Sequence, residues 1–223
     1  MVDDLWGYRI SATVGQSVLD QATHFSANAV VSPTMTRVTV YVCRRYHVEV
    51  EKIPDWYAQW RVALGFDRVE YGVGGIQLFR SDELARRQVG FAVASNGESL
   101  VGDGPGDWRP EWVVIGHDTA CGDPVFASDE IPYPVFTAMH GQGSWDRKLV
   151  APSLETFAQC LVAFQRFAAG RGNPMGVDAN PPTSAQQAQF LTIIRNLTDG
   201  DEDALGFWAV QIELDLDAFM WPT

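Results

Sequence analysis

The chain is poor in cysteine and in basic residues. Its 223 residues include 3 Cys, and Cys43, Cys121 and Cys160 are far apart, without Cys-x-x-Cys spacing. This pattern fits reduced thiols in a cytoplasm better than a disulfide framework. Lys and Arg number 16 against 28 Asp and Glu, so the formal net charge is −12. Such a surface repels nucleic acid and favours a basic protein partner, although many cytoplasmic proteins are acidic for solubility alone.

The chain also has no apolar run of membrane-spanning length, and its N-terminus shows no basic segment followed by an apolar one. We therefore expect no membrane helix, no secretory signal and a cytoplasmic location. What the sequence does have is 46% hydrophobic and 12% aromatic residues, with 8 Trp. Disordered chains lack aromatic residues, so this composition predicts a folded protein with a substantial core.

The spacing of apolar residues in the first 65 residues predicts three helices. A weakly amphipathic helix is expected over 14–31, and Ser32-Pro33 favours a second helix over 33–46. Residues 37–50 are rich in β-branched and aromatic residues, whose propensity favours a strand. We retain the helix over 33–46 as the prediction. The next helix follows Pro54 and ends at Gly65, and its core-facing side is expected to consist of Trp56, Tyr57, Trp60 and Leu64.

Downstream, a strand at 76–79 is expected to precede a helix capped by Ser81, and residues 96–109 read as a surface loop. Four short apolar runs between 111 and 151 then predict antiparallel strands joined by tight turns. A helix capped by Ser153 follows, a linker covers 170–184, and Ser184 with Gln187 forms a capping-box pattern for another helix. Alternation from 207 to 216 predicts a final strand.

Polar residues between 116 and 145 raise the question of a metal site. His117, Asp118, Asp123 and His140 are of the types that bind zinc, iron or manganese, and a metal-dependent hydrolase using His117, Asp118 and His140 is one hypothesis. Adjacent side chains on a strand point to opposite faces, which argues against convergence of His117 and Asp118. Nothing in the sequence marks Cys121 as a reactive thiolate.

A second acidic cluster, Asp199, Asp201 and Asp203, superficially resembles a calcium loop. The glycine required at the sixth position is replaced by Ala204, and no glutamate closes the loop at the twelfth. We therefore interpret this run as a solvated turn that ends the preceding helix.

The order of the predicted elements resembles the SUKH superfamily of Smi/Knr-type proteins. The matching stretches are "WVVIGHDTACGDPVFASDE", "YPVFTAMHGQGSW" and "LVAPSLETFAQCL", which contain a Gly-Asp-Pro turn, a His-Gly turn and a Ser-capped helix. Upstream, "IPDWYAQW" is similar to the family's Leu-Pro-x-x-Tyr helix. The residues that carry the resemblance are expected to be fold determinants. They are Gly116, Asp118, Gly122, Asp123, Pro124, Trp145 and Ser153.

The resemblance implies one α+β domain, with a mixed or mainly antiparallel sheet flanked by helices. Its core would span about 53–170, with an N-terminal helical extension over 1–50 and a C-terminal helix-strand elaboration over 171–223. The resemblance implies no catalysis and no cofactor. Bacterial members include immunity proteins that neutralise a cognate toxin, and some eukaryotic members are regulatory scaffolds. We therefore expect an immunity protein that binds a basic toxin, with a scaffold protein or the metal-dependent hydrolase as alternatives.

Overall fold

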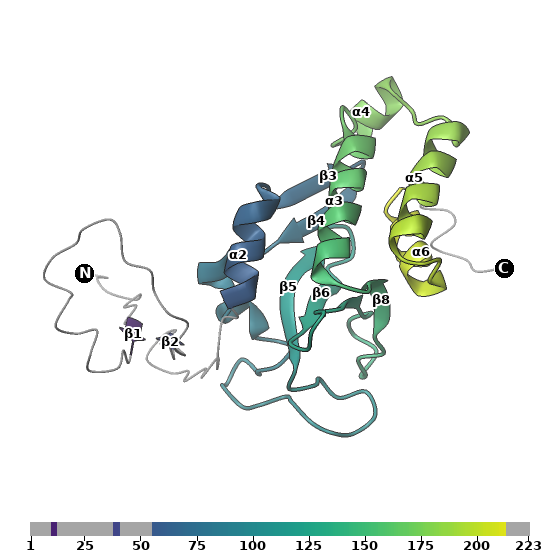
Figure 1. Ribbon diagram of the computed structural model, residues 1–223. Helices are drawn as coiled ribbons and strands as arrows, with labels where there is room; N and C mark the ends of the chain where they lie inside the picture. Colours follow the sequence, from purple (N-terminus) through teal and green to yellow (C-terminus); the bar gives the residue numbers. More distant parts are fainter. Residues whose placement is uncertain (1–9, 13–37, 41–54, 213–223) are drawn as a thin grey trace, which may run out of the picture.

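The computed structural model describes residues 10–12, 38–40 and 55–212, and its centre is a six-stranded sheet. The strands lie in chain order, and each neighbouring pair is antiparallel. Their bounds are β3 Arg68–Tyr71, β4 Gly74–Leu78, β5 Trp112–Asp118, β6 Pro124–Ser128, β7 Val135–Thr137 and β8 Lys148–Ala151. The expected single α+β domain is confirmed, with this sheet in the antiparallel form (Figure 1).

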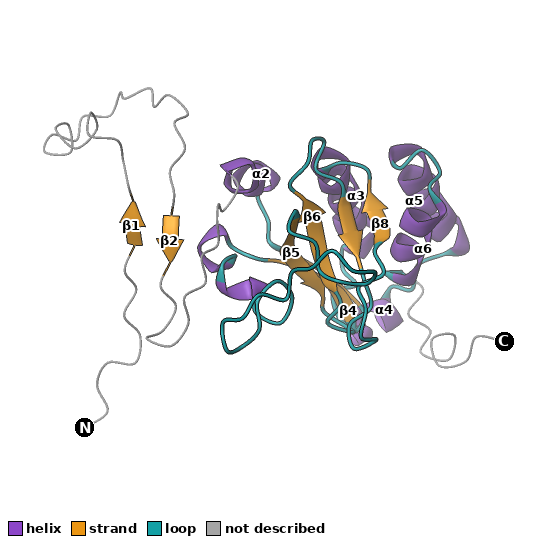
Figure 2. Cartoon of the chain, turned by 90° about the horizontal axis from the view of Figure 1, so that it is seen from below, coloured by secondary structure: helices purple, strands orange, loops and turns teal. Residues whose placement is uncertain are grey.

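The helices lie on one face of this sheet and beside one of its edges. Helices α2 and α3 lie over the face, whereas α5 and α6 lie beside the β8 edge (Figure 2). No helix in the described part of the chain is long and apolar enough to cross a membrane. The helix bounds are α2 Asp55–Leu64, α3 Leu154–Ala168, α4 Pro174–Ala179, α5 Ser184–Leu197 and α6 Glu202–Val210.

Both faces of the sheet are buried, which explains why β6 is buried at each of its residues. On the helical side, Phe157 and Phe164 of α3 are fully buried. The long connection between β4 and β5 covers the opposite side and contributes Trp108, whose ring centroid lies 4.9 Å from that of Phe126. A sheet covered on both faces needs apolar residues at successive strand positions, so strict alternation is not expected in its central strands.

Local signals predicted the principal helices correctly. Ser153 caps α3, because its hydroxyl accepts a hydrogen bond from the Thr156 amide. Helix α5 begins with a capping box, but the box uses Thr183 and Gln186, one residue before the predicted pair. Asp199 and Gly200 end α5 with positive φ angles of 52° and 76°, as the solvated-turn interpretation requires.

Three elements differ from the sequence prediction. Ser81 does not cap an α-helix, because two 3₁₀ turns, η1 Ser81–Glu83 and η2 Arg86–Gln88, stand there without a side-chain cap. The linker over 170–184 contains α4, which Asn173 caps. The strand over 207–216 is wrong as far as Val210, because Asp201 caps α6, which runs to that residue.

The N-terminal prediction is wrong at one described segment. Strands β1 Ile10–Ala12 and β2 Val38–Val40 pair antiparallel in a separate two-stranded sheet. The helix predicted over 33–46 therefore fails at β2, where the β-branched Val-Thr-Val sequence favours an extended chain. The helix expected over 14–31 and the end of the final strand, from 213 on, lie outside the described residues.

Candidate functional site

Asp118 is a structural tie at the turn between β5 and β6. Its side chain is buried, and its Oδ1 accepts hydrogen bonds from the amides of Ala120 at 2.7 Å and Cys121 at 3.2 Å. Its Oδ2 accepts a hydrogen bond of 2.6 Å from the side-chain amide of Gln211. Because both carboxylate oxygens are occupied, Asp118 closes the turn and joins the sheet to the end of α6.

Backbone geometry explains three more of the motif residues. At Gly116 on β5, an added Cβ would lie 2.5 Å from the Gln77 carbonyl oxygen, so a side chain cannot fit beside β4. Gly122 has a φ of +83°, which favours glycine. Pro124 opens β6 opposite His117. That these residues determine the fold stays a prediction of the resemblance.

Asp123 ties the same turn to the loop after β7. Its Oδ1 lies 2.6 Å from Nδ1 of His140 and accepts a hydrogen bond of 2.9 Å from the His140 amide. Its Oδ2 accepts a hydrogen bond from the thiol of Cys121 at 3.2 Å. Partial burial, together with the neighbouring Asp118 and Asp123 carboxylates, raises the pKa of Cys121 to about 12. This thiol is therefore protonated at neutral pH and is a poor nucleophile.

His117 does not join the other residues of the hypothetical metal site. Its ring lies 5.4 Å from that of Phe79, and burial, followed by the nearby charge of Arg87, lowers its pKa. Asp118 is already occupied by its turn, and His140 by Asp123. Within the described ranges, no three His, Cys, Asp or Glu side chains are grouped to hold a metal ion. The arrangement therefore supplies no ligand set for the hydrolase hypothesis.

The remaining motif residues also pack or cap. The Trp145 amide donates a hydrogen bond of 2.8 Å to the Gly106 carbonyl, and its ring meets that of Trp108 edge-on at 5.3 Å. These contacts fasten the loop before β8 to the long β4–β5 connection. Ser144 donates a weak hydrogen bond of 3.3 Å to Asp146, which fits a turn residue.

A separate feature is an open groove of about 1220 Å³ on the helical side of the sheet. Its floor is the outer face of α3, with Ala158 and Val162 half-buried along it, and its walls come from α2 and α5. Ile193 of α5 is 41% exposed and lines it. Its principal apolar lining residues are Trp56, Trp60, Leu64, Tyr133, Leu154, Val162, Phe167, Phe190, Ile193 and Leu197.

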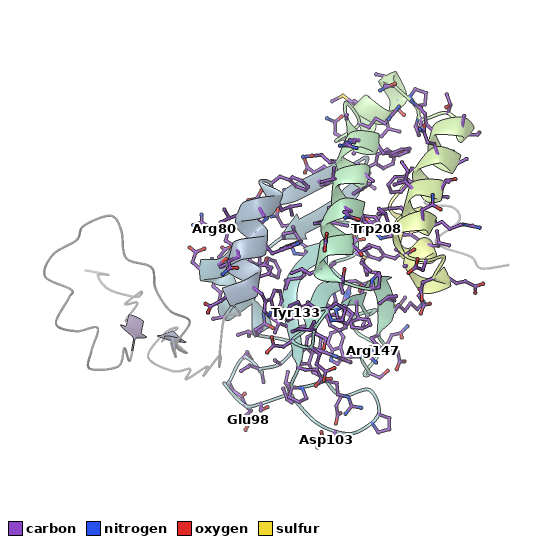
Figure 3. All side chains as sticks on the ribbon, in the orientation of Figure 1. Arg80, Glu98, Asp103, Tyr133, Arg147 and Trp208 are labelled. Carbon is purple, nitrogen blue, oxygen red and sulfur yellow. The ribbon has the colours of Figure 1, made fainter. Side chains whose placement is uncertain are left out.

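Hydrogen bonds hold the aromatic wall of the groove in place. The indole of Trp56 stacks on Tyr133 at 4.6 Å, and its N–H donates to Asp129 at 2.9 Å. The indole N–H of Trp60 donates to the Leu154 carbonyl at 3.0 Å. Tyr133 lies near the N-terminal end of α3 (Figure 3). Since these rings are fixed before anything binds, a ligand or partner would lose little side-chain entropy in meeting them.

Arg171 closes the far end of the groove. It is 5% exposed, and its guanidinium donates to the carbonyls of Phe167 and Asn180, both at 2.6 Å. A longer contact of 3.3 Å reaches the side chain of Gln186. These acceptors lie at the ends of α3 and α4 and at the start of α5. The side chain therefore clasps three helices together and shapes the groove.

The aromatic side of α2 is the signal of this groove in the sequence. Trp56, Trp60 and Leu64 pack against the core, as their spacing predicts, but they stay half-buried. Tyr57 is the α2 residue that is fully buried. The Tyr57 hydroxyl donates to the Phe79 and Ile115 carbonyls, which pins α2 to β4 and β5. Two Trp residues one turn apart therefore mark the edge of a groove in this helix.

Comparisons of the chain with protein-family models, with curated proteins and with solved structures found no match. The similarity to the SUKH superfamily therefore rests on the sequence motifs quoted above.

Proposed function

We propose that this protein is a non-enzymatic binding protein, and specifically an immunity protein of the SUKH type that neutralises a cognate toxin. The observation that supports the proposal is the groove between α2, α3 and α5, with its fixed aromatic wall. Open apolar grooves lined by aromatic side chains are typical of protein recognition, because burial of the rings supplies much of the binding free energy.

The charge of the chain indicates the sign of the partner. With a net charge of −12, the protein attracts a basic partner over long range and repels the phosphate backbone of nucleic acid. A cytoplasmic location agrees with the cysteine pattern. A toxin that is basic overall would be steered toward this surface, and apolar contacts would then hold the complex.

The test is co-expression with the product of a toxin gene, if one neighbours the gene of this protein. We expect the wild-type protein to restore growth and to bind the purified toxin in calorimetry. Ile193→Glu places a charge in the groove and should weaken binding about tenfold or more, because a buried charge without a partner is costly. The matched control is Val210→Glu, since Val210 is 43% exposed and lies outside the groove.

Three results bear on the proposal. Weak binding by Ile193→Glu and near wild-type binding by Val210→Glu would support it. Absence of binding by the wild-type protein, with no rescue of growth, would remove the toxin as its partner. Equal loss in both variants would show that the groove is not the contact surface.

A further inference from the structure

The groove has the form of a trough open to one side. Helix α3 forms its floor, and both views place α2 and α5 on either side of α3 (Figures 1 and 2). An α-helix is about 10–12 Å across with its side chains, and packed helices lie about 8–10 Å apart. The lining comes from helices and adjoining loop residues, so the groove offers no strand edge for an extended peptide to pair with.

The floor allows a close approach. Ala158 and Val162 are half-buried and lie one turn apart on the outer face of α3. Small and β-branched side chains leave room for the ridge of side chains on an opposing helix. Exposed glutamines add neutral polar side chains, with Gln159 on the floor helix α3 and Gln186 and Gln189 on α5. A helix seated here would bury an apolar stripe and keep its polar face in water.

Two charges of opposite sign mark the ends of the floor. Glu155 and Arg166 are exposed and line the groove, and neither forms an ion pair with another described residue. They are 166 − 155 = 11 residues apart, which corresponds to about 16 Å along α3 and about 20° around it. The two charges therefore lie on one face, about three turns apart.

From this layout we propose that the groove binds an amphipathic α-helix of the partner, aligned in the same direction as α3. A basic side chain near the start of the partner helix would lie opposite Glu155, and an acidic side chain eleven residues later opposite Arg166. The dipole of the bound helix supports the same direction, because its positive N-terminus would face Glu155 and its negative C-terminus Arg166. The inference rests on the proposed function and adds the form of the partner.

The probe is a pair of stapled helical peptides of about 15 residues, a length at which unstapled helices are marginal. Both carry Leu at helical spacing. The forward peptide has Lys near its N-terminus and Glu eleven residues later, and the reversed peptide exchanges these two residues. With full-length protein and fluorescence anisotropy at low salt, we expect the forward peptide to bind about tenfold tighter.

Exchanging the charges of the protein is the decisive variant. Glu155→Lys combined with Arg166→Glu should reverse the preference, so that the reversed peptide binds tighter. Arg195→Glu changes an exposed charge of α5 outside the groove and should leave the preference as it is. Circular dichroism confirms that each variant is folded.

Other occupants give different results. Equal binding of both peptides, or no binding of either, would overturn the proposal. Binding of dodecanoate with no peptide preference would overturn the proposal in favour of an acyl ligand. A dimer in sedimentation that Ile193→Glu dissociates would overturn it in favour of a second copy of the chain. Toxin neutralisation without any peptide preference would contradict the binding of a partner helix but not the proposed function. A peptide preference without any toxin binding removes the proposed function alone.

Discussion

Side chains with the chemistry of metal ligands can instead stabilise turns by hydrogen bonding. The carboxylate of Asp118 accepts hydrogen bonds from two backbone amides and from Gln211. The carboxylate of Asp123 accepts them from the His140 amide and the Cys121 thiol. A carboxylate that accepts several hydrogen bonds satisfies donors that burial would otherwise leave unpaired at a cost of roughly 1–3 kcal/mol each. Residue types and spacing in a sequence do not separate these two uses, because both place acids and imidazoles at turns.

The first prediction at this scale concerns the reactivity of Cys121. Its pKa of about 12 means that the thiol is protonated below that pH, and only the thiolate reacts with iodoacetamide. We expect slow alkylation of Cys121 at pH 7, rising about tenfold per pH unit up to pH 11. Mass spectrometry of peptides reports this site separately from the other cysteines.

The control for this experiment is Asp123→Asn. The charge of Asp123 and its hydrogen bond with the thiol contribute to the raised pKa, so the variant should be alkylated faster at a given pH. Fast alkylation of the wild-type protein at pH 7 would contradict the prediction and would revive nucleophilic chemistry at this turn.

At the scale of elements, Arg171 connects α3, α4 and α5. Arg171→Lys should lower the free energy of unfolding by roughly 3 kcal/mol, because one ammonium cannot reach acceptors that the planar guanidinium meets in several directions. Urea denaturation measures the loss. Arg166→Lys is the control, since the side chain of Arg166 is exposed and makes no hydrogen bond with the described residues, and we expect a change under about 0.5 kcal/mol. Wild-type stability in Arg171→Lys would show that the clasp is unimportant.

Predictability from the sequence differs among the elements. Helix α3 is predictable because Ser153 caps it and apolar residues recur on one face. Helix α6 is less predictable. Its buried residues Ala204 and Trp208 are four positions apart, as in a helix. The alternation of Val210 and Ile212 with the apolar residues at 214 and 216 favours a strand instead. The helix predicted after Ser81 is wrong for another reason. The segment forms two short 3₁₀ turns, and the Gln88 side chain bonds to both backbone groups of Val114 in β5, a tertiary contact that the local sequence does not show.

At the scale of the whole molecule, the groove could not be predicted. Trp56 of one wall and Leu197 of the other are 197 − 56 = 141 positions apart in the chain. Only the packing of α2 and α5 against α3 brings the walls together. The sequence supplies the apolar side chains but does not state which of them the core leaves uncovered. Net charge and composition, by contrast, follow from the sequence alone.

Trp208 tests whether the C-terminal helices belong to the same cooperative unit as the sheet. Its side chain is fully buried, and its ring lies within 6.5 Å of Phe157, Phe164 and Phe190. Its indole N–H donates to the Val150 carbonyl of β8 at 3.1 Å, so α6 covers a sheet edge that would otherwise be open (Figure 3).

We expect Trp208→Ala to lower the free energy of unfolding by roughly 3–5 kcal/mol, because it leaves a large cavity between α3, α5 and β8. Trp208→Phe keeps most of the packing but leaves the Val150 carbonyl unpaired, and should cost roughly 1–2 kcal/mol. Urea unfolding, followed by tryptophan fluorescence and by far-ultraviolet circular dichroism, should stay a single coincident transition in both variants. Two separate transitions in Trp208→Ala would mean that α5 and α6 unfold independently, and the groove would then have a wall that can detach from its floor.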